Sequence, residues 1–129
     1  MKYQDLQSGT WYQVTDQGAR EGNYLESSAT ALFIYTLAKA INKGYIGNEY
    51  IEPTQKAFDG MVKTFTRLEE DGSYTITNCC AVAGLGGDSK RYRDGSFEYY
   101  ISEPIIENDP KSVGSFILAA IEYEKMTKK

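Results

Sequence analysis

The order of apolar and polar positions predicts two helices that are apolar on nearly every side. From Tyr24 to Ile41 apolar residues recur around the whole helical wheel for about four turns, and after Glu26 in the first turn the next charges are Lys39 and Lys43 near the helix end. A second helix of this kind is predicted from Asp109-Pro110, where Asp can cap the helix and Pro can open it, to about Lys125. Such helices must be covered on all sides.

One amphipathic helix is predicted between them, from Pro53 to Leu68, with a stripe formed by Ala57, Met61, Phe65 and Leu68. The remaining segments predict shorter elements. These are the tail of a helix over residues 1–9, extended segments at 10–14, 74–77 and 97–101, loops at 15–23 and 83–95, and a turn at Asp71-Gly72.

A single amphipathic helix cannot cover two helices that are apolar all round. We therefore expect the chain either to pack against copies of itself, as a dimer or larger oligomer, or to form part of a larger helical assembly. No repeat of fixed period is visible, but alternation of enveloped and half-exposed helices is typical of an α/α toroid.

Length and composition narrow the possibilities. The 129 residues suit one domain spanning 1–129, and 41% hydrophobic with 25% charged residues argues against disorder. No run is long enough for a membrane span, and no apolar signal region follows Lys2, which makes a cytoplasmic location the default expectation. A net charge of −4 argues against nucleic acid as a partner.

The chemistry open to the chain is limited by two further features of composition. Histidine is absent, which excludes Ser-His and Cys-His nucleophile pairs and the commonest metal ligand. The only cysteines, Cys79 and Cys80, are adjacent and are predicted to be buried, reduced thiols. We therefore expect no metal and no cofactor, and any reaction must depend on Asp, Glu, Tyr, Lys or Arg.

Several segments, in order and over most of the chain, carry a resemblance to known enzymes. They are GTWYQVTD at residues 9–16, GNYLESSATALFIYTLAKAINKGY at 22–45, AGLGG at 83–87, and YRDGSFEYYISEPIIENDPKSVGSF at 92–116. The chain resembles the C-terminal part of the unsaturated glucuronyl and rhamnogalacturonyl hydrolases, glycoside hydrolase families 88 and 105, and family 105 most of all.

The resemblance implies an all-α fold, a partial (α/α)6 barrel of about three helices with short strands and long loops. It implies an oligosaccharide capped by an unsaturated uronic acid as the ligand. In these enzymes an aspartate protonates the C4–C5 double bond and assists a water at C5, and the resulting hemiketal falls apart without a metal.

Family members are more than twice as long as this chain. Their catalytic aspartate lies in an N-terminal half, which this sequence does not contain, and their active-site histidines are also missing. Because general acid–base catalysis contributes roughly 10²–10⁴-fold, we expect little or no hydrolysis from the chain alone. The expected partner is then a missing N-terminal half or a further copy of the chain.

Candidate binding residues near the start of the first long helix have two readings each. Trp11, the only tryptophan, could stack on a sugar as the matching family aromatic does, or anchor the core. Glu26 and Ser27 open an otherwise apolar helix and could bond sugar hydroxyls. Alternatively, Glu26 is an ordinary acidic residue favoured by the helix dipole.

A second group of candidates follows the glycine-rich loop. Arg91, Arg93 and Asp94 are candidate substrate-binding residues, and the arginines could bind a uronate carboxylate. Alternatively, an Arg-Asp pair fixes the loop. Tyr99 could face a carbohydrate, although tyrosine is equally a half-buried packing residue. Glu98 and Glu103 could also be read as a glycosidase carboxylate pair.

Two other functions fit the same pattern. The chain could be a non-catalytic carbohydrate-binding or oligomerisation module, or an unrelated α-toroid protein with no sugar ligand.

Overall fold

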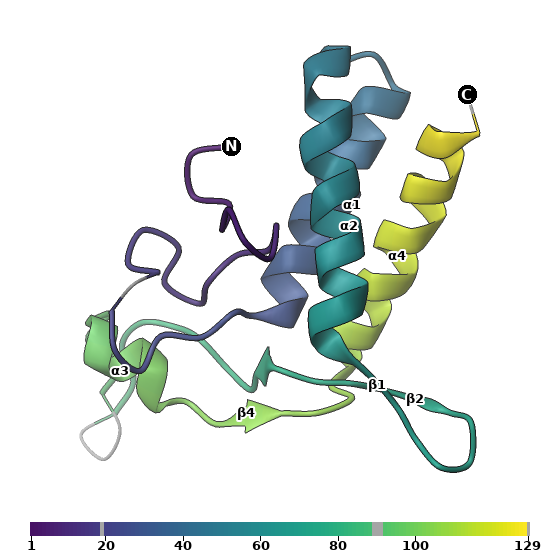
Figure 1. The fold of residues 1–129 in the computed structure, drawn as a ribbon. Coiled ribbons are helices and arrows are strands. Elements are labelled where there is room, and N and C mark those ends of the chain that lie inside the picture. Colours follow the sequence, from purple (N-terminus) through teal and green to yellow (C-terminus); the bar gives the residue numbers. More distant parts are fainter. Residues whose placement is uncertain (19, 89–91, 129) are drawn as a thin grey trace.

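The computed structural model describes residues 1–18, 20–88 and 92–128, and helices dominate it (Figure 1). The helices are α1 (Ser27–Asn42), a 3-10 turn η1 (Asn48–Tyr50), α2 (Ile51–Phe65), α3 (Phe97–Ser102) and α4 (Pro110–Thr127). The strands β1 (Thr66–Leu68) and β2 (Tyr74–Ile76) form one antiparallel pair, and β3 (Cys79–Cys80) and β4 (Ile105–Ile106) form another.

The three long helices alternate in direction. α1 and α4 begin at the same end of the molecule and run side by side in the same direction, while α2 returns antiparallel to them (Figure 1). Such an arrangement of two parallel helices with an antiparallel third agrees with the expected α/α architecture. No helix within the described residues has the length and apolar character needed to cross a membrane.

Both enveloped helices form close to their expected bounds. Asp109 caps α4 by accepting a hydrogen bond from the Lys111 backbone at 2.8 Å, and Pro110 occupies the first turn. At the end of α1 the backbone turns through Gly44, whose φ of +71° suits a residue without a side chain. The caps encoded in the sequence therefore set the bounds of these helices.

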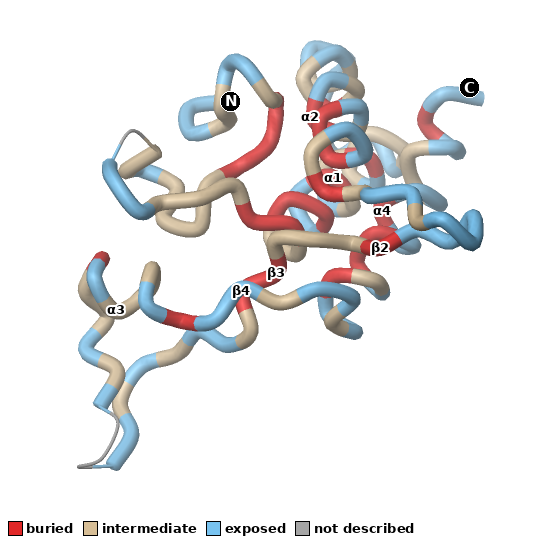
Figure 2. Tube along the Cα trace, turned by 60° about the horizontal axis from the view of Figure 1, so that its bottom comes forward, coloured by how far each residue is buried: buried red, intermediate tan, exposed pale blue. Residues whose placement is uncertain are grey.

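The core lies where α1, α2 and α4 meet, and Figure 2 shows the buried positions concentrated there and at β3. Its members are Trp11, Ala31, Ile34, Ala57, Met61, Phe65, Phe116 and Ala119.

The opposite sides of the two parallel helices are open to solvent. Leu32 on α1, and Ile117, Leu118 and Ile121 on α4, are each between 44% and 56% exposed. We call these four residues the open apolar face. The sequence pattern predicts that these two helices are covered on every side. Within the described residues they are covered on one side only.

Three expected elements differ in the structure. Residues 1–9 form turns rather than a helix end, because the Asp5 carboxylate accepts from the Ser8 backbone at 2.7 Å and holds a local turn, and Gly9 (φ +77°) then lies against α2. The predicted helix 53–68 ends at Phe65, since residues 66–68 pair with β2 across the turn at Gly72. The predicted extended segment 97–101 is helix α3, which Ser96 caps by accepting from the Tyr99 backbone at 3.1 Å.

Candidate functional site

The residues singled out from the sequence lie toward one end of the molecule, where α1 and α4 begin. The segment before α1 and the segment between β3 and α4, which contains α3 and β4, come together at this end (Figure 1). The N-termini of two parallel helices and two long loops therefore surround the candidate site.

Glu26 is buried and fully engaged by protein donors. One carboxylate oxygen accepts from the Ala29 backbone at 2.7 Å, and the other accepts from the Cys80 backbone at 3.0 Å and the Ser28 hydroxyl at 2.9 Å. The carboxylate thus caps α1 and ties it to β3. Glu26 is therefore a helix cap, and the helix dipole also favours a negative charge at this position.

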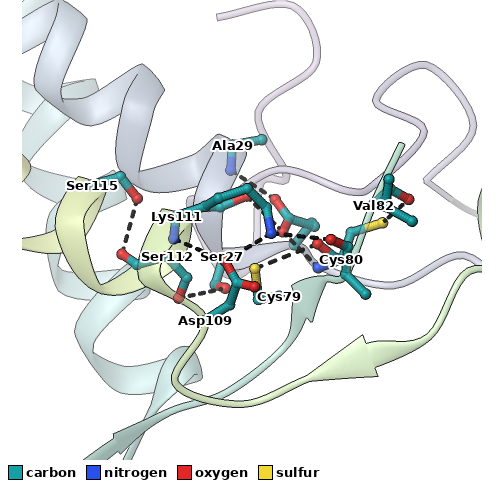
Figure 3. A network of polar contacts seen from close by, with 12 residues as sticks. Ser27, Ala29, Cys79, Cys80, Val82, Asp109, Lys111, Ser112 and Ser115 are labelled. Atoms are coloured by element: carbon teal, nitrogen blue, oxygen red, sulfur yellow. Dashed lines mark hydrogen bonds and ion pairs between the residues drawn. The ribbon is translucent and has the colours of Figure 1, made fainter. Parts of the chain in front are cut away.

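Ser27 belongs to the same network, which joins the starts of α1 and α4 (Figure 3). Its backbone donates to the Asn78 carbonyl at 2.9 Å, and its hydroxyl oxygen lies 3.5 Å from that of Ser112. On the α4 side, the Lys111 ammonium donates to the Asp109 carboxylate at 2.7 Å and to the Ala81 carbonyl at 3.1 Å. This network fixes the framework beneath the loops.

The two cysteines are buried and reduced, as predicted. Burial and the nearby Glu26 carboxylate raise the pKa of Cys79, which disfavours the reactive thiolate. The Gln13 side chain donates to the Cys80 sulfur at 3.2 Å. Among the described residues no three His, Cys, Asp or Glu side chains gather in a way that could hold a metal ion.

Trp11 is held in the core and also borders a cavity. Its backbone donates to the Thr30 hydroxyl at 3.1 Å, and only 5% of the residue is exposed. Its ring meets Phe33 edge-to-face, with centroids 5.1 Å apart. A cavity of about 240 Å³ lies beside this pair, and its lining comprises Met1, Trp11, Phe33, Thr36 and Leu37. Trp11 therefore anchors the core, and it also lies beside a cavity, as stacking on a sugar would require.

Arg93 forms an ion pair with Glu103 rather than with Asp94. The Arg93 Nε lies 3.4 Å from a Glu103 carboxylate oxygen, and the Glu103 side chain is fully buried. Asp94 instead accepts from the Ser96 backbone at 2.9 Å, and hydrogen bonds from Ser96 lower the pKa of Asp94. Arg91 lies outside the described residues.

Tyr99 joins the Arg93–Glu103 pair to the glycine-rich loop. Its hydroxyl accepts from the Gly84 backbone at 3.0 Å. Burial, followed by a hydrogen bond to Glu103, raises the pKa of Tyr99. Glu98 pairs at the surface with Arg20, whose guanidinium lies 3.8 Å from the Phe97 ring centroid.

The structure therefore places the candidates in three groups rather than one. Glu26 and Ser27 share the network at the helix starts, Trp11 lies with Phe33, and Arg93 and Tyr99 meet at Glu103. Sequence reasoning missed the contact of Phe33 with Trp11 and the role of Glu103 as the partner of Arg93. No local pattern signals either contact, because each joins separate segments of the chain.

Comparison with known proteins gives the same picture of the fold. The model of Glycosyl Hydrolase Family 88 matches residues 1–127. The structure of the C. acetobutylicum ATCC 824 glycoside hydrolase from family 105 superimposes on 95% of this chain, with a TM-score of 0.91 and 46% identity. A possible family 105 member from Klebsiella pneumoniae subsp. pneumoniae MGH 78578 gives a TM-score of 0.72 with 28% identity over 98% of this chain. The expected all-α, partial-barrel fold is confirmed.

The similarity covers only part of each related protein. This chain corresponds to 34% of the C. acetobutylicum glycosidase and to 28% of the Klebsiella protein. Protein Atu3128 of Agrobacterium fabrum (strain C58) and the 24.9 kDa protein in the picA locus of Rhizobium radiobacter are each 38% identical over 120 residues. The chain spans about half (52%) of the length of these two relatives.

Proposed function

This chain belongs to glycosyl hydrolase family 88, and we propose that it is the substrate-binding part of a glycosidase for oligosaccharides capped by an unsaturated uronic acid. The observation that carries the proposal is the superposition of 95% of the chain on about a third (34%) of a family 105 glycosidase. In our proposal, a fragment with this fold contributes its loops to the substrate-binding cleft of the complete barrel.

Four aspartates of the described residues have shifted pKa values, and the direction of the shift does not suit a general acid. A general acid working near neutral pH needs a raised pKa. Hydrogen bonds from neighbouring groups instead lower the pKa of Asp5, Asp71, Asp94 and Asp109, which keeps these side chains ionised. In our proposal, as the family resemblance implies, the proton donor is an aspartate in the part of the barrel to which this chain does not correspond.

We assign the aromatic cavity at Trp11 to contact with the sugar ring. Sugar C–H surfaces pack well on aromatic side chains, and the cavity of about 240 Å³ combines Trp11, Phe33 and Leu37 with the hydroxyl of Thr36. Glu26 and Ser27 have a structural role in this proposal, since their polar groups are engaged within the protein.

The open apolar face is, in our proposal, the surface that receives the other helices of the toroid. Monomeric proteins rarely expose large contiguous apolar patches. α1 and α4 are parallel neighbours with apolar sides uncovered, and the matched glycosidase contains roughly twice as much further chain, since 34% of it is represented here. Apolar faces of further barrel helices are the partners that suit such a surface.

A complementation experiment tests this function. The chain would be co-expressed with the portion of the C. acetobutylicum family 105 glycosidase that it does not cover, and loss of the ultraviolet absorbance of an unsaturated uronyl disaccharide would be followed. We expect activity from the mixture and none from either part alone. A Leu118→Glu variant should abolish complementation, while Thr127→Glu, an exposed position on the same helix, should not.

Other outcomes discriminate the alternatives. Sugar binding by the lone chain without restored hydrolysis would identify a non-catalytic carbohydrate-binding module. A tight homodimer that Leu118→Glu dissociates would assign the open apolar face to a second copy. If the chain shows no sugar binding and no complementation, the proposed function is contradicted.

A further inference from the structure

We infer that Arg93 binds the carboxylate of an acidic sugar through its terminal nitrogens, and that Glu103 positions the Arg93 guanidinium from within the protein. This inference rests on the proposed function and specifies which chemical group of the ligand Arg93 binds. It assigns a role to Glu103 that differs from that of a catalytic carboxylate.

The backbone of Arg93 is fixed on both sides. Arg93 and Gly86 exchange two backbone hydrogen bonds, of 2.8 and 2.9 Å, in an antiparallel bridge. The loop is further held at Gly84, whose backbone donates to the Tyr99 hydroxyl. The Arg93 side chain therefore starts from a defined position although it lies in a loop.

The Glu103 carboxylate, which pairs with Arg93, is shielded from solvent. The Glu103 side chain is 0% exposed, whereas that of Arg93 is 27% exposed. A buried carboxylate needs charged or hydrogen-bonding partners, and here it has Arg93 and the Tyr99 hydroxyl. The pair is thus oriented with its negative member inside and its positive member reaching the surface.

The described arginines differ in how many donors their protein partners occupy. Arg67 uses Nε and both terminal nitrogens on Glu69 and Glu107, and Arg20 uses both terminal nitrogens on Gln17 and Glu98. Within the described part of the chain, Arg93 uses Nε alone, in its contact with Glu103.

The remaining donors of Arg93 suit a carboxylate. The two terminal nitrogens of a guanidinium form a planar fork that binds carboxylate oxygens in a bidentate manner. Because Nε is held by a buried anion, the fork loses less orientational freedom when a ligand binds. A uronic acid supplies such a carboxylate, and a neutral sugar does not.

The test compares an unsaturated digalacturonate with its fully methyl-esterified form, by isothermal titration calorimetry of the whole chain at pH 7. We expect the wild-type chain to bind the acid roughly ten- to a hundredfold more tightly than the ester, the range typical of hydrogen bonds to charged groups. Arg93→Gln should bring this ratio close to one. Arg67→Gln, which removes an arginine from a different ion pair, should leave the ratio unchanged.

Two further variants separate positioning from folding and from simple charge. Arg93→Lys keeps the charge without the fork and should give an intermediate ratio, which also serves if Arg93→Gln fails to fold in a thermal melt. Glu103→Gln should lower the ratio while the affinity for the ester stays the same. An increased ratio in Glu103→Gln would mean that Glu103 merely neutralises Arg93, and would overturn its positioning role.

The outcomes distinguish this inference from the function on which it rests. If the wild-type chain binds acid and ester equally, or if Arg93→Gln keeps the preference for the acid, the inference is wrong and carbohydrate binding stands. If the wild-type chain binds neither ligand, the carbohydrate-binding function fails and the inference fails with it.

Discussion

The hydroxyl oxygens of Ser27 and Ser112 lie 3.5 Å apart although the two residues are separated by 85 positions. Each serine stands in the first turn of its helix, and both are buried. Their small side chains allow the starts of α1 and α4 to come together. With the same offset of 85 positions, Ala31 on α1 corresponds to Phe116 on α4, and both residues belong to the core. The two helices therefore bury corresponding positions.

The correspondence extends to the exposed side. With the same offset Leu32 matches Ile117 and Phe33 matches Leu118, and all four are exposed apolar residues. Two parallel helices that bury and expose equivalent positions are what a toroid of repeated hairpins requires. The sequence shows no repeat at this offset, because the matched residues share apolar character and burial rather than identity or size.

The close approach of the helix starts predicts sensitivity to a larger side chain. Ser112→Leu should destabilise the fold by about 1–3 kcal/mol, because overpacking forces neighbouring side chains and backbone to shift. The free energy of unfolding would be measured by urea denaturation. Thr127→Leu, on the exposed last turn of α4, is the control and should change it little. An unchanged midpoint for Ser112→Leu would show that the contact is loose.

Removal of the Glu26 carboxylate should be more damaging than its place at a helix end suggests. Glu26→Ala deletes the cap of α1 and leaves the buried Cys80 backbone N–H without its acceptor, at a combined cost of about 2–4 kcal/mol. Glu52→Ala, in the first turn of α2 but exposed, should cost far less. Thermal denaturation of the two variants checks the difference, and equal losses would contradict the assigned role.

Acid should weaken the junction between β3 and α4. The side-chain hydrogen bond from Lys111, followed by the Lys111 backbone, lowers the pKa of Asp109 below its ordinary value of 3.8. A carboxyl whose pKa is lowered by folding stabilises the fold above its unfolded pKa, and this contribution is lost as the pH falls through the folded pKa.

The Asp109→Asn variant tests this assignment. It should be less stable than the wild-type chain at pH 7, and the difference should shrink as the pH falls below about 3.8, where the wild-type carboxyl becomes protonated. Urea denaturation at pH 7 and at pH 3 provides the comparison. A difference that is independent of pH would assign the contribution of Asp109 to helix capping by a neutral group.

The two thiols should be unreactive in the folded chain. Both cysteines are buried, and burial together with the Glu26 carboxylate raises the pKa of Cys79. A thiol reagent such as Ellman's reagent at pH 8 should therefore detect none of the 2 cysteines natively and both in guanidinium chloride. Rapid labelling of the native chain would mean that β3 opens readily. Glu26→Ala should accelerate native labelling, since it releases β3 from α1.

Local patterns in the sequence determined where the three long helices lie, and the composition determined which side chains are available for chemistry. Asp109-Pro110 and the apolar run before Gly44 encode where α4 and α1 lie, because capping and periodicity depend on residues a few positions apart. The excess of apolar helix surface and the family resemblance were likewise readable from the sequence alone.

Only the tertiary structure decided how the candidate residues are used. It turned Glu26 into a cap bonded to Cys80, paired Arg93 with Glu103 instead of Asp94, and set Trp11 against Phe33. It also made a helix of residues 97–102, where aromatic content suggested a strand. Each pairing depends on segments that meet through the packing of α1, α2 and α4, and a contact between such segments leaves no periodic signal in the sequence.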